Sequence, residues 1–369
     1  MLNRIITLIY KELLAVWRDK KSRTVIIVPP LTQLFIFSIA ATLDVTNVPI
    51  GILNRDSGEH SIELIQRLYG SPMFNKVMFL NSVAEIGDFI DNQRGVAVVH
   101  FDPQFSRNID ARKKADVQII LDGRKSNTAQ IVAGYFTSIV EDYSRKTSKD
   151  VGYQVQTTRL FPRNWYNPNL IYYWYNVPSL CGIITLLIAM LVTGLTVARE
   201  RELGTFDQLL VSPLTPIEIL IGKAVPGILI GIAEGTLIVL AAIFVFKIPF
   251  LGSFILLYAG MLVFVCSVVG FGLLISSLSN TQQQAILGTF VFLTPAITLS
   301  GFATPVENMP TWLQYVTLIN PLRYFLVIAR GQFLKATPAD IVWNNTWPMI
   351  LIAVVTLTGA VLLFRRRLA

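Results

Sequence analysis

Apolar runs and one long polar segment divide the chain. A helix needs about 20 mostly apolar residues to cross the hydrocarbon core of a bilayer. Runs of this length recur at residues 24–43, 177–198, 221–246, 252–278, 283–303 and 346–364. Residues 44–175 contain no such run and hold 29 of the chain's 54 charged residues. The pattern predicts an α-helical polytopic membrane protein with six transmembrane helices and one soluble insertion after the first.

The insertion at residues 44–175 alternates between strand-like and helix-like segments. Strands are predicted at 48–53, 76–80, 95–101 and 116–122, and helices at 61–68, 83–92 and 126–149. A small α/β domain is therefore expected. Residues 176–369 are expected to form a transmembrane domain of five helices.

Basic residues concentrate in the short segments between spans. Residues 1–23, 199–223 and 365–367 together hold 12 basic and 6 acidic residues. Short loops rich in Lys and Arg stay in the cytoplasm, so both termini are expected inside and the α/β domain outside. The net charge of +8 is then a topology signal, and no nucleic-acid partner is expected.

Residues 1–23 are expected to form an amphipathic helix in the cytoplasmic membrane interface. Apolar residues from Leu2 to Trp17 recur at helical spacing, opposite Lys11 and Arg18. A plain cytoplasmic lead-in to the first span explains the pattern as well. A cleaved signal peptide is disfavoured, because the apolar run that follows has full transmembrane length.

The segment RERELGTFDQLLVSPLTPIEILIGK (199–223) carries two helix-start signals. Thr205 and Gln208 match a capping box that precedes an apolar face, and Thr215 and Glu218 match a second one that opens the third span. The first signal predicts a short amphipathic helix between two membrane helices, which could transmit movement from a soluble partner. A well-capped loop without that role is the equal alternative.

The third span carries a row of glycines and one carboxylate. Gly227, Gly231 and Gly235 follow a small-xxx-small pattern, which lets a second helix approach closely, and helix packing is the preferred interpretation. Glu234 lies in mid-membrane, where an ionised side chain costs about 2.5–3.5 kcal/mol. A role for Glu234 in a substrate or proton pathway is a hypothesis.

Residues 304–345, before the last span, are too long for a turn and rich in apolar and proline residues. Short helices that enter the outer leaflet are expected there, with an ordered surface loop as the alternative.

The chain has no phosphate-binding loop, and His60 and His100 lack metal-ligand spacing. No catalytic residue, metal site or cofactor is therefore expected in this chain.

Seven segments that run along nearly the whole chain are informative together. They are KELLAVWRD (11–19), NWYNPNL (164–170), ARERELGTFDQLLVSPLT (198–215), IGKAVP (221–226), GFGLLISSL (270–278), SGFATPVENMP (300–310) and INPLRYF (319–325). In this order they resemble the membrane subunits of type 2 ATP-binding cassette (ABC) transporters, in particular the permeases of bacterial multidrug exporters.

The resemblance implies a coupling helix within residues 199–219 that docks on a separate ATPase subunit. Its residues would be Arg199, Glu200, Arg201, Glu202, Gly204, Thr205, Phe206, Gln208, Leu209, Leu210 and Pro213. The interfacial helix would contribute Lys11, Glu12, Trp17, Arg18 and Asp19. ATP and Mg²⁺ would bind the ATPase subunit, and a second permease subunit, identical or different, would complete the pathway. A periplasmic adaptor and membrane lipid are further expected partners in the bacterial inner membrane.

An ATP-driven exporter of drugs or amphipathic compounds is thus the leading hypothesis. The main alternative is an ion-gradient-driven transporter or channel that uses Glu234, although such proteins usually carry several membrane carboxylates or an inverted repeat. A receptor or anchor would not need six spans. A membrane enzyme is least expected, because no set of acid, base and nucleophile can be assembled.

Overall fold

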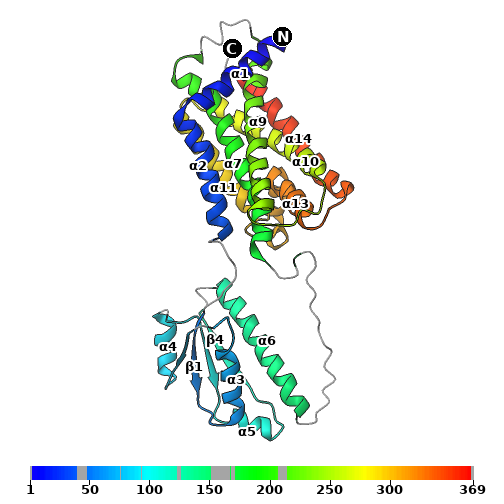
Figure 1. The fold of residues 1–369 in the computed structure, drawn as a ribbon. Helices are drawn as coiled ribbons and strands as arrows, with labels where there is room; N and C mark the ends of the chain where they lie inside the picture. Colours follow the sequence, from blue (N-terminus) through cyan, green and yellow to red (C-terminus); the bar gives the residue numbers. More distant parts are fainter. Residues whose placement is uncertain are drawn as a thin grey trace. The chain divides into compact units, whose positions relative to one another are not determined.

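The computed structural model forms two compact units (Figure 1). It describes residues 2–39, 48–74, 76–92, 94–122, 126–150, 167, 171–206 and 214–366. The helical unit comprises Met1–Ala41 and Arg163–Ala369, and the α/β unit comprises Thr42–Pro162. The chain therefore leaves the helical unit once and returns to it.

The helical unit contains eight helices of at least 14 residues in its described part. They are α1 (Leu2–Arg18), α2 (Lys20–Ile39), α7 (Tyr172–Glu202), α9 (Pro216–Phe244), α10 (Phe254–Leu278), α11 (Gln282–Thr298), α13 (Pro321–Leu334) and α14 (Ala339–Arg366). Short helices η2 (Val306–Asn308), α12 (Thr311–Val316) and η3 (Thr317–Ile319) precede α13. Each of the six predicted apolar runs coincides with a helix, and short helices occur where they were expected before the last span.

Four helices in the described part are long and apolar enough to cross a membrane: α7, α9, α10 and α14. Helix α2 contains a shorter apolar stretch, Ile26–Ser38, and α11 has 17 residues. Helix α7 lies at the centre, because 83% of its apolar window is buried, against 33–50% in the other three. It packs against α2, α9, α10, α11 and α13.

Helix starts in this unit follow the predicted capping signals. The Thr215 side chain accepts from the Glu218 N–H, and the Glu218 carboxylate accepts from the Thr215 N–H at 2.8 Å, which is the predicted capping box. Thr281 likewise accepts from the Gln284 N–H, but the Gln284 side chain bonds the Asn280 N–H instead of that of Thr281. The predicted Thr215–Glu218 signal is confirmed as a helix start, whereas Gln208 of the Thr205–Gln208 signal lies outside the described residues.

The α/β unit is built on a four-stranded sheet in the order β2-β1-β3-β4. The strands are β1 (Pro49–Asn54), β2 (Lys76–Phe79), β3 (Ala97–Phe101) and β4 (Val117–Leu121), and only the β3–β4 pair is antiparallel. The helices are α3 (Glu59–Tyr69), α4 (Ala84–Asp91), α5 (Phe105–Asp110) and α6 (Ser126–Asp150). The predicted strands and helices are confirmed to within a few residues, and α5 was not predicted.

Helices cover both faces of the sheet. Ile50 and Ile52 face a core shared with α3, α5 and α6, where Phe74 stacks on Phe136 with ring centroids 4.8 Å apart. Leu53 and Val98 face the other side and pack against α4. Successive strand residues point to opposite faces, so continuous burial along β1 and β3 follows from a covered sheet.

Candidate functional site

Charged side chains gather at one end of the helical unit. Helix α1, the C-terminal ends of α7, α10 and α14, and the N-terminal ends of α9 and α11 meet there (Figure 1). We call this end the base. Its ion pairs join Lys11, Glu12, Asp19, Arg199, Glu200 and Lys223, which we call the base cluster. These residues come from α1, from Asp19 directly after it, and from α7 and α9. Glu12 and Lys223 are 211 residues apart along the chain.

Lys223, on α9, is the centre of the base cluster and is fully buried. Its Nζ lies 2.6 Å from Glu200 Oε2 as an ion pair without hydrogen-bond alignment. It also donates to Glu12 Oε1 at 3.1 Å and to the Thr196 carbonyl at 3.5 Å. Two carboxylates and a carbonyl thus compensate one buried ammonium, as a charge without water requires.

Two further ion pairs extend the cluster along α1. Lys11 Nζ donates to Glu200 Oε1 at 3.1 Å, so Glu200 bridges two lysines. Arg199 Nη1 lies 3.6 Å from Asp19 Oδ2. Helix α1 also approaches α9 closely, because a Cβ on Gly222 would lie 2.3 Å from Leu8 Cδ2. Charge and close packing together hold α1 against the ends of α7 and α9.

A glycine ends α7 directly after the cluster. The Gly204 N–H bonds the Arg201 carbonyl, and the Thr205 N–H bonds the Glu200 carbonyl at 2.9 Å. With Gly204 at φ +70°, this is the Schellman motif, which favours glycine at that position. Arg199, Glu200, Arg201 and Glu202, which were assigned to the predicted coupling helix, therefore form the last turn of α7.

The residues beside this helix end bind the neighbouring helices. Arg201 donates to the carbonyls of Ser277 and Ser279 at the end of α10, and Glu202 accepts from the Gln282 N–H at the start of α11. The Phe206 ring lies beneath the Arg201 guanidinium and packs edge-on against Phe364 of α14, with ring centroids 5.8 Å apart. The last turn of α7 thus contacts α10 and α11, and Phe206 directly after it contacts α14.

The structure places part of the predicted coupling set and does not describe the rest. Gln208, Leu209, Leu210 and Pro213 lie outside the described residues. In α1, Trp17 and Arg18 are exposed, whereas Glu12 is buried.

Sequence reasoning missed Lys223. The available signal was a lysine within an apolar run, close along the chain to a segment that holds unusually many acidic residues.

The glycine row of α9 faces two helices at once. Added Cβ atoms would meet Thr193, Ala189 and Thr185 of α7, with the closest contact 2.2 Å from Thr193 Cγ2 to Gly227. On the other side they would meet Val269, Val265 and Met261 of α10, with Met261 Sδ 2.4 Å from the Gly235 position. The contacts step by four residues on all three helices, so no side chain larger than hydrogen fits this row without movement.

Glu234 is buried, with 8% of its surface exposed. It forms no ion pair or hydrogen bond with any other residue that the structure describes. Within the same residues, no group of three or more His, Cys, Asp or Glu side chains lies close enough to hold a metal ion. Glu234 is therefore a buried carboxylate that lies outside the base cluster.

Comparison with known families and proteins shows which proteins this chain is similar to. The model of a family described as ABC-2 family transporter protein matches residues 20–362. The chain is 48% identical to the probable multidrug ABC transporter permease YbhR of Escherichia coli, over the full length of both chains. It is 31% identical to the probable multidrug ABC transporter permease YbhS of the same organism, over 99% of this chain and 98% of YbhS. Identity to the inner membrane transport permease YhhJ of E. coli is 26%, with equal coverage.

Proposed function

Because the chain belongs to the ABC-2 family of transporter proteins, we propose that it is the membrane permease subunit of an ATP-driven exporter of drugs or other amphipathic compounds. The observation that carries the proposal is full-length similarity to permeases named for multidrug transport. ATP hydrolysis belongs to a separate ATPase subunit, which also binds ATP and Mg²⁺. The chain works as a multi-pass protein of the inner membrane, paired with a second permease subunit.

In this proposal six helices cross the membrane: α2, α7, α9, α10, α11 and α14. The base is cytoplasmic, because residues 1–23, 199–223 and 365–367 carry the excess of positive charge. Both termini are then inside, and the α/β unit is outside, where a periplasmic adaptor could reach it. The short helices within residues 304–345 lie at the outer side, and membrane lipid surrounds α1 in the interface.

The base cluster gives the proposal a coupling mechanism. Residues 207–213 join the end of α7 to the start of α9, and the base cluster fixes both ends of that segment to α1. A push on the segment from the ATPase subunit is therefore delivered to α7, which is the central helix, and to α9 and its close-packed glycine row. Transport is then driven by movement of packed helices, with no chemistry in this chain.

Glu234 has a separate place in the proposal. A buried carboxylate with no described partner fits a substrate or proton contact in the pathway. Replacing Glu234 with Gln should reduce transport of a cationic substrate while leaving assembly with the ATPase unchanged. Unchanged transport would remove this role and leave the rest of the proposal intact.

Affinity purification of the tagged chain, followed by mass spectrometry of co-eluting proteins, tests the proposal. A phosphate-loop ATPase should co-purify with the native chain and be lost from the variant Leu209→Asp/Leu210→Asp. The matched control is Ile62→Asp/Val83→Asp, which places the same charges at exposed apolar positions of the α/β unit. Absence of any ATPase from the native sample would contradict the exporter assignment.

A further inference from the structure

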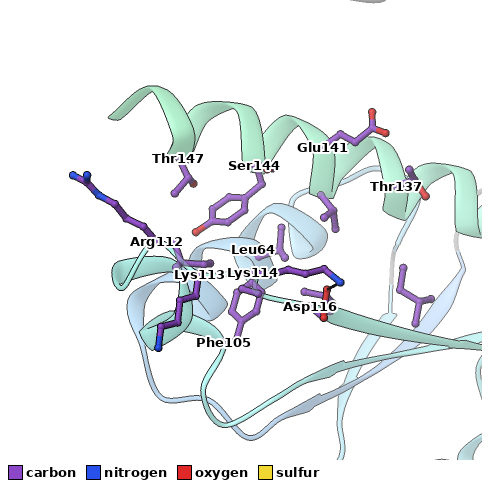
Figure 2. Close-up of a pocket in the computed structure, with 16 residues that line it drawn as sticks. Leu64, Phe105, Arg112, Lys113, Lys114, Asp116, Thr137, Glu141, Ser144 and Thr147 are labelled. Atoms are coloured by element: carbon purple, nitrogen blue, oxygen red, sulfur yellow. Dashed lines mark ion pairs between the residues drawn. The ribbon is translucent and has the colours of Figure 1, made fainter. Parts of the chain in front are cut away.

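The α/β unit contains a pocket that the transport proposal does not use. It lies between α6 and the segment that links α5 to β4, and it encloses about 700 Å³ (Figure 2). Cavities that bind small organic ligands typically span roughly 300–1,000 Å³. The pocket is therefore large enough to hold a small molecule.

The centre of the pocket is apolar and continuous with the core. Leu64, Phe105 and Tyr143 are buried in the core and line it. Val117, on β4, and Val140, on α6, are partly buried and add to the apolar surface. In the sheet that the structure describes, β4 is an edge strand, so no further strand of that sheet lies beyond it.

One wall of the pocket is held by a chain of hydrogen bonds. His60 Nε2 contacts Asp110 at 3.0 Å, and His60 Nδ1 contacts the Tyr143 hydroxyl at 2.6 Å. An ionised carboxylate only accepts, so His60 Nε2 donates to Asp110, and the other ring nitrogen shares a hydrogen bond with the Tyr143 hydroxyl. The Tyr143 ring is therefore fixed before any ligand arrives, which reduces the entropy that binding must overcome.

The charged groups of the pocket are unevenly paired. Lys114 forms an ion pair with Asp116 at 3.1 Å, and Glu141 lines the α6 side. Arg112 and Lys113 are exposed at the end nearest Thr147 (Figure 2). Within the described part of the chain, neither of these two side chains forms an ion pair or hydrogen bond. That end is therefore positively charged and available to an anion.

Arg112 occupies a backbone position that favours glycine. The Arg112 N–H bonds the Ile109 carbonyl and the Lys113 N–H bonds the Asn108 carbonyl, so α5 ends in a Schellman motif with Arg112 at φ +55°. Helix α7 ends in the same motif with Gly204. Strained residues of this kind cluster at functional sites. Here the residue at the strained position is Arg112, whose cationic side chain lines the pocket.

We propose that this pocket binds a small amphipathic organic anion. Its apolar body lies against Phe105, Val117 and Val140, and its acidic group lies at Arg112 and Lys113. Binding requires neither ATP nor the ATPase subunit, so the site can be tested independently of the coupling mechanism.

Calorimetric titration of the full chain in lipid nanodiscs tests this site, with empty nanodiscs as the blank. Naphthalene sulfonate is the anionic probe, and naphthalene methanol presents the same ring without charge. The sulfonate should bind saturably, and Lys113→Glu should weaken it roughly three- to tenfold, as loss of one exposed charge-assisted contact allows. Lys76→Glu, which reverses an exposed lysine on β2 at the opposite edge of the sheet, is the matched control and should leave binding unchanged.

A second pair of variants separates binding from folding. Arg112→Gly should weaken sulfonate binding without lowering the unfolding temperature, because glycine adopts a positive φ freely. Val140→Trp should fill the pocket and weaken both probes. The proposal is overturned if the native chain shows no saturable sulfonate binding, if both probes bind equally, or if Lys113→Glu and Lys76→Glu act alike.

Discussion

The helical unit and the α/β unit each contain one carboxylate that pairs with two basic residues, one of which also pairs with a second carboxylate. The two sets of ion pairs differ in how deeply their side chains are buried. At the base, Glu200 contacts Lys11 and Lys223, and the Lys223 side chain is fully buried. In the α/β unit, Glu63 contacts Arg67 and Lys146, whose side chains are 24% and 61% exposed. Asp142 joins Arg67 as the second acid there, as Glu12 joins Lys223 at the base.

Burial decides what each network can do. Exposed ion pairs contribute little, because water and salt screen them. A buried pair adds little net stability either, but removing one partner leaves a charge without compensation. The base cluster therefore constrains the positions of α1, α7 and α9, because breaking it leaves a buried charge unpaired. The ion pairs around Glu63 are exposed to solvent and contribute little to stability. The predictions below test this difference, from the largest expected effect to the smallest.

Lys223→Met should have the largest effect. It leaves Glu12 and Glu200 buried without their shared cation, and breaking a buried ion pair in this way costs about 3–5 kcal/mol. Thermal unfolding of the purified protein in detergent measures the loss. The triple variant Glu12→Gln/Glu200→Gln/Lys223→Met removes all three charges together and should recover most of the stability that Lys223→Met loses. A triple variant as unstable as Lys223→Met would show that shape, and not charge, holds the base.

Gly227→Val should destabilise the helical unit by about 3 kcal/mol, at the upper end of the range for overpacking. The new side chain meets Thr193 of α7 at a position where a Cβ alone would already lie 2.2 Å away. Gly134→Ala is the contrast from the α/β unit, because nothing lies within 4 Å of a Cβ there. Alanine at that helical site should stabilise by up to about 1 kcal/mol. Equal effects at the two glycines would contradict the packing described for α9.

Asp56→Asn tests a buried carboxylate that hydrogen bonds hold in the α/β unit. Burial by itself would raise the pKa of Asp56, but the Ser106 and Ser61 hydroxyls and the Gly58 and Ser106 N–H groups outweigh burial and lower the pKa below 3.8. Ionised Asp56 therefore stabilises the unit fully above about pH 4. That contribution is lost as the pH falls through the lower pKa of the folded state.

The Asp56→Asn variant should lose roughly 2 kcal/mol at neutral pH, the cost of disrupting a buried hydrogen-bonded charge. It should also lose the acid-dependent part of the stability of the unit, as hydrogen exchange in α3 measures across pH 3–6 (about the range set by linkage). Asp91→Asn, at an exposed position of α4, is the control. An unchanged pH profile in Asp56→Asn would contradict the role assigned to these hydrogen bonds.

Lys146→Met should have the smallest effect, at most about 0.5 kcal/mol, because it removes one exposed partner of Glu63. The Glu63 pKa is lowered chiefly by its hydrogen bond with Arg67, which remains. Thermal unfolding of the variant beside Lys223→Met gives the comparison directly. A loss as large as that of Lys223→Met would overturn the contrast between the two networks.

Periodic and capping signals made most of the fold predictable from sequence. Apolar runs coincide with helices of the helical unit, four of which are long and apolar enough to cross a membrane in the described residues. Thr215 with Glu218 marked the start of α9, because a capping box acts over a few neighbouring residues. Helix α5 escaped prediction because it is a single short segment and its end carries Arg112, where a glycine would have signalled the stop. The same motif at the end of α7 carries Gly204 and fits the usual pattern.

The centre of the candidate site was less predictable. Arg199, Glu200 and Glu12 were selected through resemblance, but Lys223 was not, because its partners are 23 and 211 residues away along the chain. Pairing across such distances depends on how α1, α7 and α9 pack, and local sequence does not report it. The pocket beside α6 was missed for the same reason, since its lining comes from α3, α5, β4 and α6.

The most direct test of coupling through the base is hydrogen exchange of the chain bound to its ATPase subunit, with and without a non-hydrolysable ATP analogue. In the native chain, ATP binding should change exchange in residues 207–213, in α1 and at the start of α9. In Glu12→Gln/Glu200→Gln/Lys223→Met, the change should stay in residues 207–213 and no longer reach α1. An α1 response that is the same in both proteins would contradict the claim that the base cluster transmits the movement.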